Sequence, residues 1–222
     1  MSPRKFKGDE KAKRSMVWPI EKRLINFLAP LVPSWLQTYH LTMMTVLWSA
    51  VVVLSCWLGK NDIRWLWGAS AAILLQYITD ILDGEIGRRR DTGLIKWGYY
   101  MDHMLDYVFA GTIVIGYTLI IPETYMTIIV AGFVMFTAFM VHAYLYFATT
   151  NDMIIGYVGF GPTEIRFLLI ANNTLMIYLG ATYMMSFLPY VLGVALIAFI
   201  VSIYRAHKRI WKLDMERKRR NA

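Results

Sequence analysis

Four aspartates occur in two pairs inside long apolar stretches of the chain. Asp80 and Asp83 are three residues apart, and Asp102 and Asp106 are four apart. On a helix, either spacing places both side chains of a pair on one face. Carboxylates in spanning helices are costly to insert and face an interior or a water-filled cavity. Four of them close together also repel one another, and divalent cations would remove that repulsion. An all-oxygen ligand set favours hard ions such as Mg²⁺, Mn²⁺ or Ca²⁺.

Residues around the aspartates suit a nucleotide better than an ion alone. Gly84 directly follows Asp83 and would let a ligand approach the backbone closely. Arg88 lies one turn further on and suits bidentate contact with phosphate. Gly98, one turn before Asp102, removes a side chain where a flat base could lie against the helix. Two metal ions at such a site can hold and polarise a pyrophosphate.

The composition indicates that these residues lie in an all-α membrane protein. Hydrophobic residues make up 57% of the 222 residues and charged residues only 17%, whereas soluble domains are about a quarter charged. An apolar run of roughly 20 residues is what a spanning helix needs. The sequence predicts six such helices, at 41–59, 64–87, 95–121, 124–149, 163–183 and 186–207.

A different helix is expected before the first span. Apolar residues at helical spacing alternate with charged ones from Val17 to Leu36, and Pro30 and Pro33 end the run. This pattern is typical of an amphipathic helix at the membrane interface. A helix packed on the membrane domain away from lipid stays an alternative. The expected organisation is a basic N-terminal segment with this helix at 1–40, a six-helix domain at 41–207 and a basic tail at 208–222.

The basic residues predict the orientation. With both termini in the cytoplasm, 21 of the 23 Lys and Arg residues lie on the cytoplasmic side and only Lys60 and Arg64 lie outside. Helix 2 then ends at Arg88 on the cytoplasmic side, and Asp80 lies about 10–12 Å below it. We therefore expect a multi-pass protein of the cell membrane whose site faces the cytoplasm. The net charge of +8 is concentrated at the ends of the chain, which favours anionic membrane lipids over nucleic acid as partners.

The spacing of these residues resembles the signature of the CDP-alcohol phosphotransferase (phosphatidyltransferase) family, D-x2-D-G-x2-A-R-x8/9-G-x3-D-x3-D. The match comprises Asp80, Asp83, Gly84, Arg88, Gly98, Asp102 and Asp106, with nine residues between Arg88 and Gly98. The chain departs from the signature at Gly87, where the family usually has Ala. The six-helix plan and the amphipathic segment before it are also similar to the family.

The resemblance implies a function and a role for each matching residue. The four aspartates would hold two divalent ions, Mg²⁺ or Mn²⁺, and Asp106 would also be the general base on the acceptor hydroxyl. Gly84, Arg88 and Gly98 would bind the CDP portion of the donor. The implied activity is a transferase of phospholipid biosynthesis, which moves a phosphate-linked alcohol such as phosphatidyl from a CDP-alcohol to an alcohol or lipid acceptor and releases CMP. Family members typically form homodimers.

Three further residues are candidates for binding the acceptor. His103, beside Asp102, and the segment Gly161-Pro162-Thr163-Glu164 are similar to parts of eukaryotic choline and ethanolamine phosphotransferases. Pro162 and Glu164 also fit the ordinary start of a helix. Arg166 needs an anionic partner inside the membrane, which would be Glu164, a site carboxylate or a substrate phosphate. The motif does not distinguish CDP-diacylglycerol from a CDP-aminoalcohol as donor.

Intramembrane carboxylates would equally suit a divalent-cation transporter or channel. Transporter sites tend to lie near the bilayer midplane, at broken helices in related repeats. This site is expected near one interface, and a transporter has no need of Gly84, Arg88 and Gly98. The transferase is therefore the favoured hypothesis, and the transporter is the alternative.

Overall fold

The fold is a bundle of long helices. The computed structural model describes residues 18–151 and 162–220. Within these ranges the chain forms seven α-helices and no strand. The helices are α1 (Trp18–Leu28), α2 (Thr38–Gly59), α3 (Leu66–Arg89), α4 (Ile95–Thr118), α5 (Met126–Thr150), α6 (Pro162–Leu179) and α7 (Leu188–Arg220).

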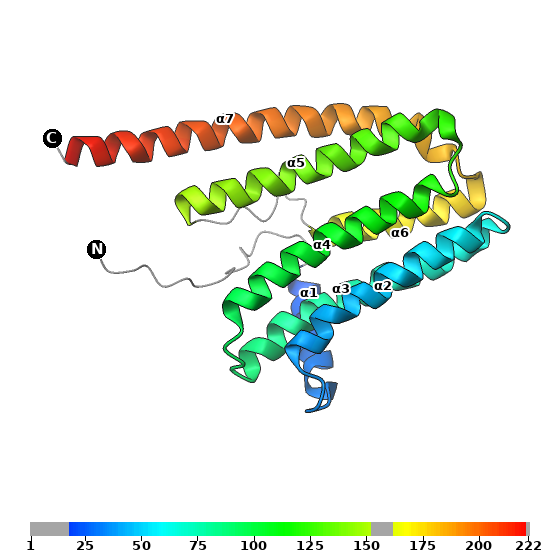
Figure 1. The fold of residues 1–222 in the computed structure, drawn as a ribbon, viewed down its shortest axis with the longest axis horizontal. Coiled ribbons are helices and arrows are strands. Elements are labelled where there is room, and N and C mark those ends of the chain that lie inside the picture. The colour runs from blue at the N-terminus through cyan, green and yellow to red at the C-terminus, as the bar shows by residue number, and fades with distance from the viewer. Residues whose placement is uncertain (1–17, 152–161, 221–222) are drawn as a thin grey trace.

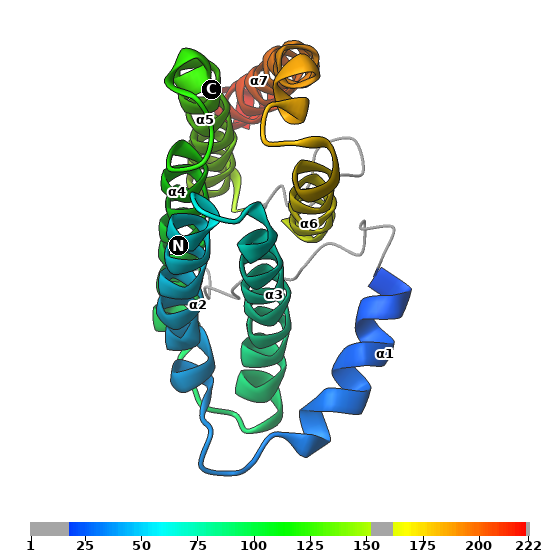
Figure 2. The same ribbon diagram turned by 90° about the vertical axis from the view of Figure 1, so that its right-hand side faces the viewer.

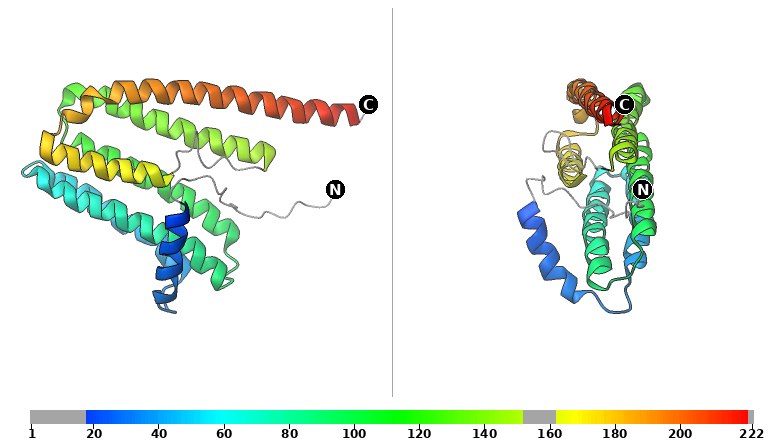
Figure 3. Two further views of the ribbon diagram at one scale, coloured as in Figure 1. Left: turned by 180° about the vertical axis from the view of Figure 1, so that it is seen from behind. Right: turned by 90° about the vertical axis from the view of Figure 1, so that its left-hand side faces the viewer.

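The six helices from α2 to α7 run side by side along the long axis of the molecule, and α1 crosses them (Figure 1). The α2–α3, α4–α5 and α6–α7 connections lie at one end, and the α3–α4 turn lies toward the other (Figure 1). Seen along the bundle, α3 packs against α2 and α6, while α4 packs against α2 and α5 (Figure 2). The same neighbours appear from behind, where α6 lies along α3 (Figure 3).

Four helical segments within the described residues are long and apolar enough to cross a membrane. They are Thr38–Gly59, Ile63–Arg89, Glu123–Thr150 and Leu188–Arg220, which contain α2, α3, α5 and α7. The two remaining long helices stand where spans were expected but are less apolar. The charged residues explain this: α4 carries Asp102 and Asp106, and the shorter α6 carries Glu164 and Arg166.

Small residues let α2, α3 and α4 approach closely in the apolar core. A Cβ on Gly116 of α4 would lie 2.7 Å from Sγ of Cys56 on α2, and one on Gly68 of α3 would lie 2.6 Å from Oγ of Ser55. Close packing of this kind is how helices associate where lipid removes the hydrophobic driving force. Cys56 is fully buried, as expected for a small apolar residue.

A hydrogen-bonded group that we call the amide network joins α3, α4 and α6. The Tyr117 hydroxyl donates to Oδ1 of Asn173 at 2.6 Å, and Nδ2 of Asn173 donates to the Ser70 hydroxyl at 3.1 Å. Nδ2 of Asn172 lies 3.4 Å from the Tyr117 hydroxyl. Asn173 is 0% exposed. Both asparagines of α6 therefore bond to residues of other helices.

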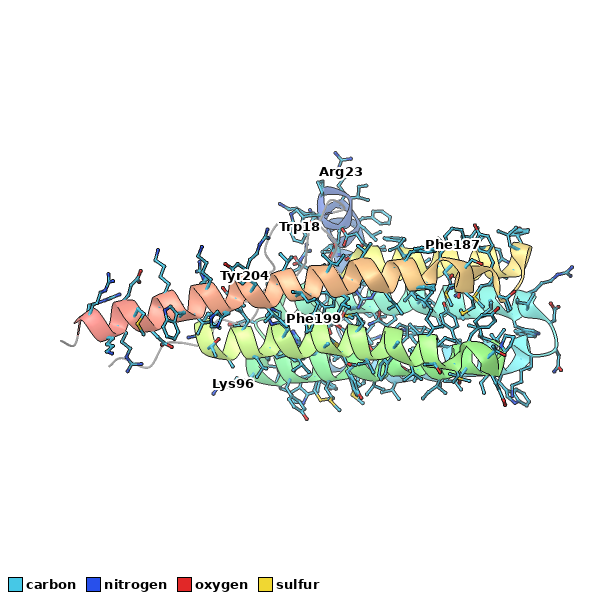
Figure 4. All side chains as sticks on the ribbon, turned by 90° about the horizontal axis from the view of Figure 1, so that it is seen from above. Trp18, Arg23, Lys96, Phe187, Phe199 and Tyr204 are labelled. Carbon is cyan, nitrogen blue, oxygen red and sulfur yellow. The ribbon has the colours of Figure 1, made fainter. Side chains whose placement is uncertain are left out.

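The segment from α1 to α2 is anchored to the end of α3. Ile25 and Ala29 pack against the α3 residues Ile81, Leu82 and Ile86. The guanidinium of Arg90, just after α3, donates to the carbonyls of Val32, Pro33, Ser34 and Leu36 at 2.7–3.4 Å. Because four carbonyls depend on one side chain, Arg90 fixes the path of the chain between α1 and α2. Arg23 points away from the bundle (Figure 4).

Helix α7 is longer than the sequence indicated. A span ending near 207 and a separate tail were expected, but α7 continues unbroken to Arg220. Residues 208–220 are mostly Lys, Arg, Glu, Leu and Met, which are good helix formers in water as well as in lipid. Near its middle, α7 packs on α5 through Phe199, whose ring centroid lies 5.1 Å from that of Phe139 (Figure 4).

Candidate active site

Three of the four aspartates meet in one group, which we call the aspartate cluster. Asp80 of α3 and Asp102 and Asp106 of α4 each offer a carboxylate oxygen, and these oxygens lie within 4.8 Å of one another. Both helices pack on α2, which is the support that holds their aspartate faces together. Asp102 and Asp106, four residues apart, share the face of α4 that meets Asp80, as their spacing predicted. Asp102 and Asp106 are 33% and 31% exposed, so the cluster remains open to a ligand.

Arg166 of α6 lies against this cluster. Its Nη2 atom is 3.0 Å from Oδ2 of Asp80 and 3.1 Å from Oδ1 of Asp106. The Arg166 side chain is 11% exposed, and its Cζ lies 5.9 Å from the centroid of the Tyr77 ring. Of the three partners considered for Arg166, the structure shows site carboxylates.

Asp83 is not one of the three aspartates whose oxygens lie within 4.8 Å of one another. Its Oδ2 accepts a hydrogen bond of 2.9 Å from the Thr42 hydroxyl on α2, and the residue is buried. A carboxylate oriented by a second residue is typical of the surroundings of a metal site. The predicted role of Asp83 as a metal ligand stays a prediction.

The aspartate cluster fits a divalent cation by ligand type and by charge. Carboxylate oxygens are the ligands preferred by Mg²⁺ and Mn²⁺. When the three carboxylates are ionised, they and Arg166 together carry a formal charge of −2, which one divalent ion neutralises. Two like charges 4 Å apart repel by about 4 kcal/mol at the effective dielectric constant of a protein surface. The residues present therefore suit a metal ion.

The expected nucleotide residues lie on α3 and α4, the two helices that carry the aspartate cluster. A Cβ placed on Gly98 would meet nothing within 4 Å, so the space beside this turn of α4 is open. A Cβ on Gly84 would lie 3.4 Å from Nη1 of Arg88, whose guanidinium folds back over the helix. Arg88 pairs with Glu85 at 2.9 Å and is largely exposed. These positions leave room for a ligand, and the nucleotide roles stay predictions.

The departure from the family signature at Gly87 has a structural counterpart. A Cβ on Gly87 would lie 3.2 Å from Oγ1 of Thr38, the first residue of α2. Thr38 is buried, and its hydroxyl has no hydrogen-bond partner in the described part of the chain. The bulk of Thr38 therefore occupies space that an alanine methyl would need.

The two other candidate acceptor residues are placed differently from Arg166. Nδ1 of His103 lies 2.8 Å from the carbonyl oxygen of Tyr99, and because a carbonyl only accepts, Nδ1 carries the proton. The His103 ring lies 4.4 Å from the Tyr99 ring and 5.2 Å from the Tyr144 ring, by centroids. Glu164 is in the first turn of α6 and is partly buried. Gly161 lies outside the described residues.

Sequence reasoning missed two residues that support the site. Thr42 fixes Asp83, and Arg90 fixes the segment that leads into α2. Neither had a signal of its own, since a threonine in an apolar helix and the last residue of an Arg88-Arg89-Arg90 run are both common. Their roles follow only from which helices become neighbours in space.

Comparison with known proteins agrees with the site. Neither the curated proteins nor the solved structures contain a match to this chain. The family model of CDP-alcohol phosphatidyltransferases matches residues 31–204, which include the seven positions that agree with the signature and Arg166. A cation transporter, the alternative that carboxylates alone left open, finds no support in this match. The chain therefore belongs to the CDP-alcohol phosphatidyltransferase family.

Proposed function

We propose that the protein transfers a phosphate-linked alcohol group from a CDP-alcohol to the hydroxyl of an acceptor and releases CMP, as a step of phospholipid biosynthesis. The observation that carries the proposal is the aspartate cluster, formed by signature residues of α3 and α4 within 4.8 Å. Membership in the family supports the reaction class. The donor is either CDP-diacylglycerol or a CDP-aminoalcohol.

Each residue has a defined task in this reaction. Asp106 takes the proton of the acceptor hydroxyl as its oxygen forms a bond to the phosphorus that is transferred. The bond from that phosphorus to the oxygen of CMP breaks, and CMP leaves with the electron pair. Gly84, Gly98 and Arg88 hold the CDP portion, with Arg88 exchanging Glu85 for phosphate. Arg166 binds an acidic group of the substrate, and His103 and Glu164 are further candidates for contact with the acceptor.

Divalent ions, Mg²⁺ or Mn²⁺, would be held by Asp80, Asp102 and Asp106 together with Asp83. When bound, they supply charge neutralisation for the pyrophosphate and for the leaving CMP. Asp83 can take this ligand role without losing Thr42, whose hydroxyl donates to one of its two oxygens, Oδ2. The carboxylate has a second oxygen, so one can keep the threonine while the other faces the cluster.

We further propose that all six helices from α2 to α7 cross the membrane, with both termini and the site on the cytoplasmic side. The helices that lack the apolar character of a span, α4 and α6, carry the site charges, and those charges face the bundle interior in the aspartate cluster. The charge distribution supports the orientation. A homodimer in the cell membrane is the assembly that the family suggests.

The test is binding and turnover with the purified chain in lipid nanodiscs. CDP should bind in the presence of Mg²⁺ or Mn²⁺ and dissociate when a chelator is added. Incubation with labelled CDP-diacylglycerol, CDP-choline or CDP-ethanolamine and a mixture of acceptors should then yield one labelled lipid product. CDP binding that is unchanged after the chelator is added, or transfer that continues after complete chelation, would contradict the proposal.

A further inference from the structure

A single nitrogen of Arg166 occupies the junction between α3 and α4. Nη2 is 3.0 Å from Asp80 and 3.1 Å from Asp106, which belong to different helices and to the same aspartate cluster. Both Arg166 and Asp80 are nearly buried, at 11% and 12% exposure of their side chains. This arginine comes from a third helix, α6, so its position depends on the assembled bundle.

The guanidinium and a metal ion would compete for the same oxygens. Mg²⁺ takes carboxylate oxygens at roughly 2.0–2.1 Å, closer than any hydrogen-bonded nitrogen. An ion bound by both Oδ2 of Asp80 and Oδ1 of Asp106 would therefore lie in the region that Nη2 borders. The two positive charges would repel each other at that distance, most strongly beside the nearly buried Asp80. An ion that takes these two oxygens, and not the second oxygen of each carboxylate, would displace Arg166 from at least one of them.

The surroundings offer the displaced side chain another contact. The Tyr77 ring, which packs edge-on against Phe167 at 5.6 Å, has its centroid 5.9 Å from Cζ of Arg166. An aromatic face at this range attracts a guanidinium. The arginine can therefore move off the carboxylates without losing all of its partners.

We propose that Arg166 is the counter-ion that holds the aspartate cluster together before metal binds, and that a divalent ion must displace it from Asp80 and Asp106. The inference rests on the proposed function, since it assumes that the cluster binds metal. It sets an order of events in which metal binding releases the guanidinium, which is then available to an anionic group of a substrate. Coupling between two binding events is reciprocal. The ion pairs of Arg166 with Asp80 and Asp106 therefore lower the metal affinity by the same factor by which bound metal weakens those ion pairs.

The experiment measures Mn²⁺ affinity of the full chain in nanodiscs without substrates. After removal of metal by chelation and dialysis, Mn²⁺ is titrated and the free ion is followed by its paramagnetic resonance signal. Arg166→Gln and Arg166→Met, of which the second keeps the apolar stem beside Tyr77, should each bind Mn²⁺ about tenfold more tightly than the original chain. Arg166→Lys should return the affinity to nearly the original value. Arg64→Gln, at the opposite end of the bundle, is the matched control and should change nothing.

Thermal unfolding gives a second readout. Without metal, Arg166→Gln should melt at a lower temperature than the original chain, because the carboxylates lose their counter-ion. Saturating Mn²⁺ should reduce or abolish this difference.

The outcomes separate this inference from the proposed function. Equal or weaker Mn²⁺ binding by the neutral variants overturns the inference alone, because it assigns Arg166 no competing role. Failure of the original chain to bind Mn²⁺, or an Mn²⁺ affinity that Asp102→Asn leaves unchanged, overturns the metal site and the inference with it. A neutral variant that fails to fold without metal but folds in Mn²⁺ supports the counter-ion role.

Discussion

Two polar groups lie between the same three helices, α3, α4 and α6, and they differ in almost every physical property. The amide network of Ser70, Tyr117 and Asn173 is neutral, has its hydrogen bonds satisfied internally, and contains a residue that is 0% exposed. The aspartate cluster lies about 15 Å further along α3, at ten residues of 1.5 Å each. It is charged, about one-third exposed at Asp102 and Asp106, and in contact with the guanidinium of Arg166.

The difference shows that polarity inside an apolar bundle does not by itself indicate function. A neutral network needs nothing from outside and contributes to packing between helices. A group of carboxylates with excess charge and partial exposure is costly unless another charge joins it. The aspartate cluster is therefore the group that requires a positively charged ligand.

The largest effect is expected at Asp106. Asp106→Asn removes the base but keeps the shape and most hydrogen-bonding positions. Transfer of label from the CDP-alcohol should fall by about 100-fold or more, the range that general-base catalysis contributes. CDP binding in Mn²⁺ should change little, since three other carboxylates remain. Full turnover by this variant would show that Asp106 is not the general base. Asp106 would then have no more part in the chemistry than the residues of the amide network.

Arg166 should affect one substrate more than the other. If it receives a phosphate of the acceptor, Arg166→Ala loses a charge-assisted hydrogen bond of about 1.5–3 kcal/mol. The KM for the acceptor should then rise at least about tenfold, while the KM for the CDP-alcohol stays within a few-fold. An unchanged KM for the acceptor would show that Arg166 does not bind the acceptor and contacts only the aspartates.

Asn173 should matter for stability and not for chemistry. Asn173→Ala leaves the Tyr117 and Ser70 hydroxyls without their principal partner and should lower the free energy of unfolding by about 1 kcal/mol. Turnover per folded molecule should be unaffected. Asn172→Ala is the control, with a smaller loss expected because its contact with Tyr117 is longer, at 3.4 Å. A loss of turnover in folded Asn173→Ala would show that the amide network also serves the reaction.

The smallest effect is expected at Gly87, where the change in the free energy of unfolding depends on packing and not on charge. Alanine gains about 0.5–1 kcal/mol over glycine within a helix, but its methyl would meet Thr38 at 3.2 Å. Gly87→Ala should therefore be near neutral alone and stabilising when combined with Thr38→Ala, as measured against Thr38→Ala by thermal unfolding. Simple additivity of the two changes would mean that Thr38 does not restrict this position.

The sequence located the long helices and the aspartates that come together in the cluster, and the reason is that both are local patterns. Helical spacing of Asp102 and Asp106 is a local property, and so is the apolar character of α2, α3, α5 and α7. The positions of all six long helices followed from these patterns. The C-terminal end of α7 did not follow from these patterns. Polar residues with high helix propensity, such as Lys212 and Glu216, extend this helix beyond its apolar run.

Contacts between distant residues were the part that the sequence left open. Arg166 is 60 residues from Asp106, and Thr42 is 41 from Asp83. Such pairs depend on the angle and depth at which helices pack, and no spacing rule within one helix supplies these. The bonds of Asn173 to Ser70 and Tyr117 likewise became identifiable only once α3, α4 and α6 were neighbours.

The attachment of α1 by Arg90 has a consequence for lipids of different chain length. If α1 lies among the lipid headgroups, the four carbonyls bound to Arg90 hold the end of α3 at the same level. The aspartate cluster then stays at a constant depth below that surface, about 15 Å from Arg90 to Asp80 along the helix. A thinner or thicker bilayer would be accommodated at the opposite ends of the helices, so the reach from a donor's phosphates to the cluster would not change with its acyl chains.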